Sequence, residues 1–445
     1  MTVVVLLFAP LIRGGNRPLP LAILESMGLA MLAIALWKPR RPLSQGLPGT
    51  MRWGVAMLAA VPIVQLLPVP GAWWAMLPGH AAFARVLDIA GDDDSWRSLT
   101  LNARATQYSW LVMIACAGVF AAVRQLDRTR VRNLAVVFVA IAAVESIIGV
   151  IQAGSTPGSA IMLGNPYAGA GATGTYVNKN HYVALVEMAL PMAIALWAIE
   201  MLPRVTHHGE VLQDDPRTAD IRFALRAGFS MLTVGLLLAL ALSRSRAGIA
   251  AGLLVFALAI VALVWRMASL QAKVVLSMVI GLALSFGAYI GLTPVLERFA
   301  PDAFSMEYRS RMELAGSTLV AAMDFLPFGS GLGTFADVFR RYQGARIVGF
   351  ADHAHNDYAE LILELGVAGI AIIVLLGIAY AVRWRTVLGD RSSRRLRFMQ
   401  TAAGLGMLAM LLHAFFDFNF HIPANAIYFS FLAGVFFFIP SSDRA

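Results

Sequence analysis

The chain has 445 residues, of which 59% are hydrophobic and only 14% are charged, whereas about a quarter of an ordinary soluble domain is charged. With a mean hydropathy of +0.71, one soluble core cannot hide so much apolar surface, so the composition indicates an integral membrane protein and excludes a disordered chain. The net charge of +9 does not indicate nucleic-acid binding, because the arginines are spread over the connections between apolar segments.

A helix needs about 20 apolar residues to cross a bilayer. In chain order, the sequence predicts about twelve transmembrane helices, approximately at residues 3–12, 19–37, 53–67, 108–123, 134–151, 183–202, 227–242, 247–265, 274–292, 366–382, 401–415 and 426–439. The predicted fold class is therefore an all-α integral membrane protein.

One long polar stretch divides the predicted helices. Residues 1–292 are expected to contain helices 1–9, residues 293–365 a large extracytoplasmic loop between helices 9 and 10, and residues 366–445 helices 10–12. Inside the loop, helical periodicity at 306–325 precedes a glycine-rich turn at 329–333 and an amphipathic stretch at 335–342. A loop of this length in a compact protein is usually functional.

The distribution of basic residues predicts the orientation in the membrane. Lysines and arginines gather in alternate short connections, at residues 38–52, 124–132, 204–226, 266–273 and 383–397. The positive-inside rule places these connections and both termini in the cytoplasm. The long loop at 293–365 then lies outside.

The ionisable side chains Glu25, Glu145, Glu187 and His413 fall within predicted helices and lie in the outer half of their spans. Buried ionisable groups in membranes are costly and are often functional. Their shared depth predicts a polar cavity that opens outward. The alternative is that each group pairs with a neighbouring helix and serves packing.

Two arginine pairs are candidates for binding a phosphate or a pyrophosphate, because a guanidinium stays charged and binds oxyanions with two parallel hydrogen bonds. Arg244 and Arg246 lie where two predicted spans meet, and Arg309 and Arg311 lie on the predicted loop helix. Residues two apart on a helix point about 200° from each other, so only one member of each pair is expected to face a site. The alternatives are snorkelling to the membrane surface and a solvated charged face.

The polar segment Asp352-His-Ala-His-Asn-Asp-Tyr358 directly precedes a predicted span. Three interpretations are open. His353 and His355 chelate a metal, although His-x-His puts both rings on one face only in a strand. One histidine acts as a general base, since its ordinary pKa lies near neutrality. Alternatively, Asn356 or Asp357 is simply a helix cap.

The sequence from His355-Asn356 through nine residues to Gly366-Val-Ala-Gly369 resembles the His-Asn-x9-Gly-x-x-Gly signature of bacterial O-antigen ligases, polysaccharide polymerases and pilin oligosaccharyltransferases. Three further stretches agree in order. They are Asn178-Lys-Asn-His181, then Ser245-Arg246-Ala-Gly248, and then Arg311 followed by Pro327-Phe-Gly-Ser-Gly-Leu-Gly-Thr-Phe335. The departure is Ala247, where the family more often has glycine.

The resemblance implies a multi-span glycosyltransferase of GT-C-like architecture that is inverting and metal-independent. It implies that a glycan moves from undecaprenyl pyrophosphate to an acceptor hydroxyl on the periplasmic face of the bacterial inner membrane. Arg246 and Arg311 would stabilise the leaving pyrophosphate, and His355 would accept the proton of the acceptor. Supporting contacts to the substrates are expected from Arg244, Arg309, His353, Asn356, Lys179 and His181.

No cofactor and no metal are expected. The single cysteine, Cys116, cannot build a cysteine zinc site, and no phosphate-binding glycine motif of the Walker type is present. The expected partners are the lipid-linked glycan donor, lipid A core or a growing glycan as acceptor, and membrane lipids, but no nucleic acid.

The leading hypothesis is therefore O-antigen ligation to lipid A core. The first alternative is a polymerase that joins lipid-linked repeat units. A lipid-linked glycan flippase or transporter is an alternative of another class, but the two halves of the chain look dissimilar and the polar groups lie outward. A peptidoglycan polymerase is a further alternative, for which no specific residues are present.

Overall fold

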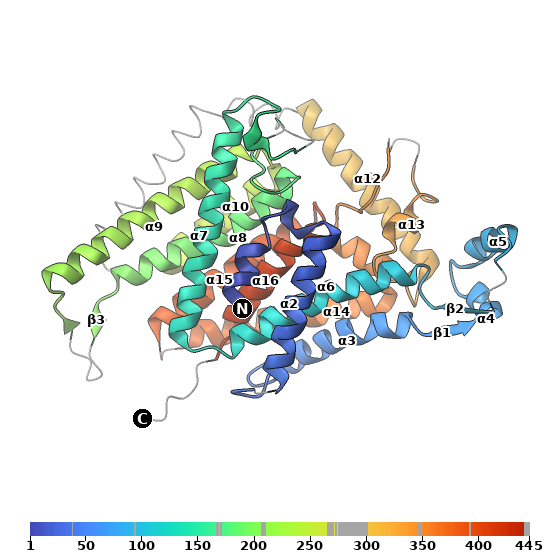
Figure 1. Cartoon of the computed structure of the whole chain (residues 1–445), viewed down its shortest axis with the longest axis horizontal. Helices are drawn as coiled ribbons and strands as arrows, with labels where there is room; N and C mark the ends of the chain where they lie inside the picture. The colour runs from blue at the N-terminus through green and yellow to red at the C-terminus, as the bar shows by residue number, and fades with distance from the viewer. Residues whose placement is uncertain are drawn as a thin grey trace.

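The computed structural model describes residues 1–37, 39–92, 95–165, 169, 171–205, 211–264, 271, 274, 301–344, 347, 349–390 and 393–439, and for residues 204–205, 211 and 301–310 it describes the backbone alone. The predicted span at 274–292 therefore lies outside the described residues, apart from residue 274. Helices dominate the described chain (Figure 1). The all-α fold class is confirmed.

The longer helices, in chain order, are α2 (Pro18–Trp37), α3 (Gly49–Gln65), α6 (Ala103–Arg124), α7 (Arg128–Ala153), α8 (Lys179–Met201), α9 (Pro216–Leu242), α10 (Arg246–Ala259), α12 (Pro301–Phe325), α14 (Asp357–Gly389), α15 (Arg394–His413) and α16 (Pro423–Phe436). The short helices are α1 (Thr2–Phe8), α4 (Gly71–Met76), α5 (Ala81–Ile89), α13 (Phe335–Phe339), the 3-10 turns Arg13–Gly15, Ala160–Met162 and Asn419–His421, and the π-helical turn Ile260–Val264. Two small two-stranded antiparallel sheets pair β1 (Pro68–Pro70) with β2 (Trp96–Ser98) and β3 (Arg204–Val205) with β4 (Val211–Leu212).

Seven of the described helices are long and apolar enough to cross a membrane. They are α2, α6, α7, α8, α9, α10 with its π-helical extension, and α14, and the shorter α16 is also apolar. Large apolar side chains such as Leu19, Trp53 and Met231 are exposed on the outside of the bundle, as expected for surfaces that face lipid. The multi-span class is thus confirmed, and the number twelve stays a prediction.

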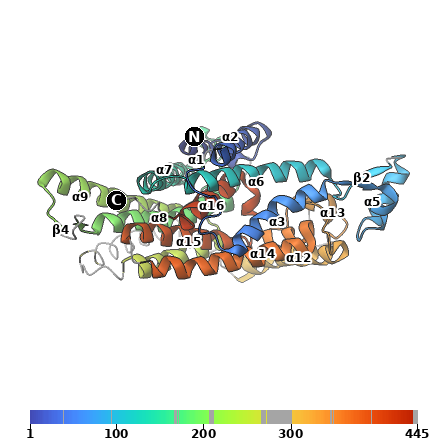
Figure 2. The same ribbon diagram turned by 90° about the horizontal axis from the view of Figure 1, so that it is seen from below.

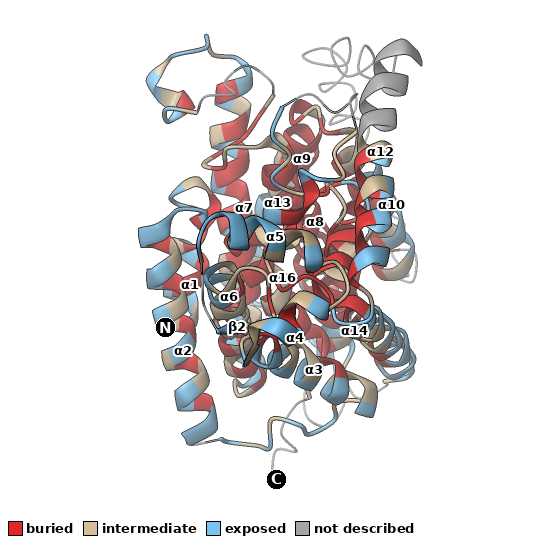
Figure 3. Cartoon of the chain, turned by 90° about the vertical axis from the view of Figure 1, so that its right-hand side faces the viewer, coloured by how far each residue is buried: buried red, intermediate tan, exposed pale blue. Residues whose placement is uncertain are grey.

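The centre of the bundle is α8. Every residue from 180 to 199 is buried, because α7, α9, α10, α15 and α16 all pack around this helix. A helix that is apolar on all sides belongs in such a position. Viewed from below, α1 and α2 lie on one side of the molecule and α12 and α14 on the other, with α8, α15 and α16 between them (Figure 2). Figure 3 shows buried residues gathered in the middle of the bundle.

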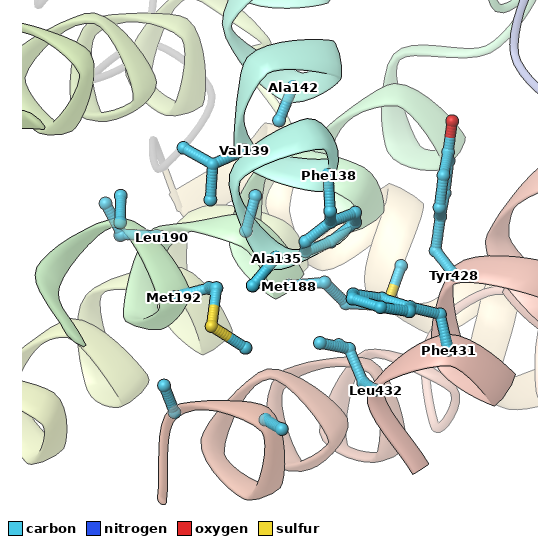
Figure 4. Packing of buried hydrophobic residues seen from close by; sticks show 14 of the residues in the cluster. Ala135, Phe138, Val139, Ala142, Met188, Leu190, Met192, Tyr428, Phe431 and Leu432 are labelled. Atoms are coloured by element: carbon cyan, nitrogen blue, oxygen red, sulfur yellow. The ribbon is translucent and has the colours of Figure 1, made fainter. Parts of the chain in front are cut away.

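Aromatic and aliphatic side chains from three helices fill this centre (Figure 4). The ring of Phe138 on α7 lies 5.3 Å from Phe431 and 5.4 Å from Tyr428 on α16, measured between ring centroids. Met188 and Met192 of α8 belong to the same cluster. This packing holds α8 and α16 rigidly, so the side chains at their N-terminal ends have fixed positions.

The glycine-rich turn at 329–333 packs against a break in α14. Gly366 has φ +59° and interrupts the helix, and a Cβ at this position would lie 2.2 Å from the carbonyl oxygen of Pro327. Backbone groups freed by the break are paired with the turn: Gly331 N–H donates to Glu364 O, and Val367 N–H donates to Pro327 O, both at 3.0 Å. The predicted loop helix and turn are present, but α14 begins at Asp357, nine residues before the predicted span.

At the opposite end of the bundle, connections predicted to share the cytoplasmic side do meet. Arg41, Arg124 and Arg383 donate hydrogen bonds to backbone carbonyls at residues 436–439, just after α16. Basic side chains are favourable at a helix C-terminus, where unpaired carbonyls gather. The side of the membrane remains a prediction, but the grouping of these connections agrees with it.

Candidate active site

Asp417 is the centre of a cluster in which four polar side chains meet. It lies in the connection between α15 and α16 and is fully buried. Its Oδ2 accepts a hydrogen bond from Nδ2 of Asn180 and lies 3.4 Å from Nη1 of Arg311. Its Oδ1 lies 3.2 Å from Nδ1 of His355 and 3.7 Å from Nε2 of His181. Segments that are far apart in the sequence thus converge on one carboxylate.

Local structure explains why His355 faces this carboxylate. His355 has φ +48°, a left-handed conformation that is uncommon for residues other than glycine. The next residue, Asn356, caps α14: its Oδ1 accepts hydrogen bonds from the N–H groups of Tyr358 and Ala359 at 3.1 and 3.0 Å. Asp357 N–H donates to the carbonyl of Ala414 at 2.9 Å and so ties the start of α14 to the end of α15. The interpretation of Asn356 as a helix cap is confirmed.

Arg311 reaches the cluster from α12. Its Nη1 also donates a hydrogen bond to the carbonyl of Phe416, next to Asp417. The loop helix therefore brings one predicted arginine to the predicted base, His355. Arg309 lies on the same helix, two residues earlier, and its side chain lies outside the described part of the chain.

Arg246 is the first residue of α10 and lies at the same end of the bundle. Ser245 caps this helix by accepting a hydrogen bond from Gly248 N–H at 3.3 Å. A Cβ on Gly248 would lie 2.2 Å from Val183 Cγ1, so the first turn of α10 packs directly on the first turn of α8. His181 lies two residues before Val183 on the same helix, so Arg246 and the Asp417 cluster both lie at the N-terminal end of α8.

The helical argument for Arg244 and Arg246 is wrong in one respect. Arg244 lies in the turn between α9 and α10 with φ +55°, because Ser245 is the cap that starts the helix. The angle of about 200° between residues two apart on a helix therefore does not apply to this pair. Both arginines are half-buried, as is Lys179 at the first position of α8.

A second cluster lies on the other side of Phe418. His353 Nδ1 is 2.8 Å from Glu360 Oε1. His421 Nε2 is 3.2 Å from the same oxygen, and His421 Nδ1 is 2.9 Å from Asp357 Oδ1. The ring centroid of Phe418 lies 4.2 Å from that of His353 and 4.9 Å from that of His355. The two predicted histidines therefore contact different carboxylates and do not form a common pair.

Charges in the two clusters are strongly coupled. Burial by itself raises the pKa of Asp417, but the contacts from His181 and His355 and the charge of Arg311 outweigh it and hold the pKa well below its ordinary value. Desolvation lowers the pKa of His421, but the charges of Glu360 and Asp357 outweigh it and raise the pKa to about 10. Asp417 is thus a stable anion beside the imidazole of His355.

Three of the four intramembrane groups have local partners. Glu145 accepts hydrogen bonds from the backbone N–H and the hydroxyl of Thr175, each at 2.8 Å. Glu187 Oε1 lies 3.0 Å from Nδ1 of His413, and both side chains are fully buried. These contacts favour the packing interpretation for Glu145, Glu187 and His413.

Sequence reasoning missed four residues of the two clusters: Asp417, Asn180, Glu360 and His421. A signal was present, because Asp417, Asn419 and His421 follow one another at alternate positions in an otherwise aromatic connection of an apolar chain. Ionisable residues at such positions are functional candidates. The prediction treated this segment only as a link between two spans.

Residues 231–374 match the family model described as O-antigen ligase. A comparison with curated proteins gave no match. The matched segment contains Arg246, Arg311, the glycine-rich turn and His355, whereas Asn180 precedes it and Asp417 follows it. Over residues 231–374 the chain is therefore similar to the O-antigen ligase family, in agreement with the resemblance that its motifs predicted.

Proposed function

We propose that this protein transfers a glycan from undecaprenyl pyrophosphate to an acceptor hydroxyl at the periplasmic face of the inner membrane, with inversion at the anomeric carbon. The observation that carries the proposal is the convergence of Arg311 and His355 on Asp417. This convergence places a guanidinium, which can bind a phosphate, close to an imidazole, which can accept the proton of a hydroxyl.

The arginines have the role of stabilising the leaving group. Negative charge grows on the diphosphate as its bond to the anomeric carbon breaks, and fixed cations near the membrane surface lower the energy of that state. Arg311 is held by Asp417 and by the carbonyl of Phe416, so its guanidinium is oriented before the substrate binds. Arg246 would approach from the neighbouring α10. Each is expected to contribute roughly 3 kcal/mol of transition-state stabilisation.

His355 has the role of the base. Its Nδ1 faces Asp417, and a buried carboxylate at Nδ1 fixes the ring orientation and stabilises the imidazolium that forms. Nε2 then accepts the proton of the acceptor hydroxyl. The acceptor oxygen forms the new bond to the anomeric carbon, the bond from that carbon to the phosphate oxygen breaks, and the electron pair leaves with undecaprenyl pyrophosphate. The guanidiniums supply the positive charge, so the step is written without a metal ion.

Purified protein in lipid nanodiscs tests the proposal. It receives an undecaprenyl-pyrophosphate oligosaccharide together with lipid A core, or with a second copy of the donor. Transfer to the core indicates a ligase, and chain extension indicates a polymerase. His355→Ala and Arg311→Ala should each lower transfer by roughly 10²-fold or more, and Arg130→Ala, at an exposed side chain, is the matched control. Undiminished transfer in both site variants would overturn the mechanism, and translocation of the donor without any transfer would favour a flippase.

A further inference from the structure

The cluster on the far side of Phe418 contains a set of side chains suited to a metal ion. His353, Glu360 and His421 each offer one ligand atom, and the three atoms lie within 4.8 Å of one another. Glu360 is buried, while the side chains of His353 and His421 are 24% and 27% exposed. A metal ion can therefore reach these atoms from the outside of the bundle.

The ligand atoms are already oriented. His421 Nδ1 lies 2.9 Å from Asp357, which leaves Nε2 directed at Glu360. The other oxygen of Glu360, Oε2, accepts the N–H of Ala354 at 2.8 Å, which leaves Oε1 directed at both imidazoles. Such outer contacts are typical of metal-binding histidines, whose second ring nitrogen is held by a carboxylate or a carbonyl.

Charge also favours a cation at this place. Asp357, Glu360 and Glu364 are spaced three and four residues apart, so they project from the same face of α14, and all three are buried. Buried carboxylates are costly unless they are paired or coordinate a metal. A divalent ion held between Glu360 and the two imidazoles would compensate two of these negative charges.

We propose that Nδ1 of His353, Oε1 of Glu360 and Nε2 of His421 bind a divalent transition-metal ion of the Zn²⁺ class. Zinc bonds of about 2.0–2.1 Å put tetrahedral ligands roughly 3.3 Å apart. The observed separations of 2.8 and 3.2 Å from Glu360 Oε1 are close to this value. Water completes the coordination on the exposed side.

The ion would brace the active site without joining the reaction. His353 lies two residues before His355, and His421 lies four residues after Asp417, so one ion would clamp the two segments that position the base and its carboxylate. The sequence predicted no metal, because His353 and His355 alone are a poor pair. The fold supplies the missing ligands from α14 and from the connection before α16.

Metal binding to the full-length protein tests this site directly. Metal-free protein without an affinity tag is titrated with Zn²⁺ by calorimetry and with Co²⁺ by visible absorption. One equivalent of Zn²⁺ and the intense bands of tetrahedral Co²⁺ are expected. The double variant H207A/H208A removes an adjacent histidine pair outside the described residues and should bind as the unaltered protein does.

Variants of the proposed ligands complete the test. His353→Ala and His421→Ala should lose the Co²⁺ bands and weaken Zn²⁺ binding at least 100-fold, and Asp357→Asn should weaken it about 10- to 100-fold. Circular dichroism and thermal unfolding check that each variant is folded. His353→Ala is expected to disturb the fold least, because the His353 side chain is 24% exposed. No stoichiometric binding, binding unchanged in both histidine variants, or binding lost in H207A/H208A would overturn the proposal.

Discussion

The two ends of the bundle use arginine in different ways. At the end predicted to be cytoplasmic, Arg383 donates to the carbonyls of Phe436 and Phe438 at 2.8 and 2.9 Å. At the end of the candidate active site, Arg311 is 3.4 Å from the carboxylate of Asp417. The first arginine caps a helix, and the second is held by a charged group beside a histidine.

Under the proposed function, this difference separates an arginine that serves stability from one that serves the reaction. Carbonyls at a helix terminus have no partner within the helix. Arg383 donates to the carbonyl of Phe436 and shares the carbonyl of Phe438 with Gln400, so we expect it to serve the fold. An ion pair with a carboxylate keeps a guanidinium in place, and its remaining N–H groups are still suited to a phosphate. Variants at the two ends should therefore fail in different assays.

The largest expected effect is on transfer at the active-site end. His355→Ala is expected to lower the turnover number by roughly 10²–10⁴-fold because the general base is lost. Arg311→Ala is expected to lower it by roughly 10²–10³-fold because a fixed cation is lost. Both proteins should keep their melting temperatures within a few degrees, as measured by tryptophan fluorescence in detergent. If either variant were inactive only because it was unfolded, the arginine and histidine of the active-site end would serve the fold, as Arg383 does at the other end.

The matching change at the other end is Arg383→Gln. It leaves buried carbonyls after α16 without their charged donor, so we expect a loss of about 3 kcal/mol in the free energy of unfolding. Transfer per folded molecule should stay unchanged. Denaturant titration measures the free energy of unfolding, and the transfer assay on the folded fraction measures activity per folded molecule. An Arg383→Gln protein that is as stable as the unaltered protein but inactive would contradict a structural role for Arg383.

Acid should weaken the active-site end first. The pKa of Asp417 is lowered in the folded protein, so its ionised form contributes stability above the ordinary aspartate pKa of about 4, and this contribution disappears as the pH falls through the lowered value. Asp417→Asn should remove this part of the acid dependence and also lose a charge-assisted hydrogen bond worth roughly 1.5–3 kcal/mol. Melting temperatures measured from pH 3 to pH 7 test this, and identical acid profiles for the two proteins would be inconsistent with it.

The smallest predicted effect concerns the cap of α14. Asn356→Ala removes the acceptor for two N–H groups and is expected to cost about 1 kcal/mol of stability. Asn356→Asp keeps a capping oxygen and should restore it. If Asn356 binds substrate, as the sequence predicted, Asn356→Asp would restore stability but would still have a higher Michaelis constant for the donor than the unaltered protein.

Much of the fold was predictable because lipid imposes strong rules. Apolar length predicted the membrane helices, and the glycine pattern predicted the turn at 329–333. The start of α14 was placed too late, since the break at Gly366 looks like a helix end in the sequence and is instead stabilised by the backbone of that turn. Hydropathy does not report such tertiary pairing.

The candidate site was predictable in part for a related reason. Arg246, Arg311 and His355 lie in motifs with recognisable spacing, and residues 231–374 match the family. Asp417 lies outside this match and gains its contacts only because the start of α8, the middle of α12 and the segment before α14 meet at it. Likewise, His353 and His355 are only two residues apart in the sequence, but one contacts Glu360 and the other Asp417. The partners of Asp417 and of the two histidines depend on which segments lie close together in the fold, and a single sequence does not show this.

A cryo-electron microscopy structure of the protein with undecaprenyl pyrophosphate bound would show directly which arginines hold the diphosphate. We expect the diphosphate within hydrogen-bonding distance of the guanidiniums of Arg246 and Arg311, with His355 facing the same space. A diphosphate bound instead among Arg41, Arg124 and Arg383, or one that contacts neither Arg246 nor Arg311, would contradict this expectation.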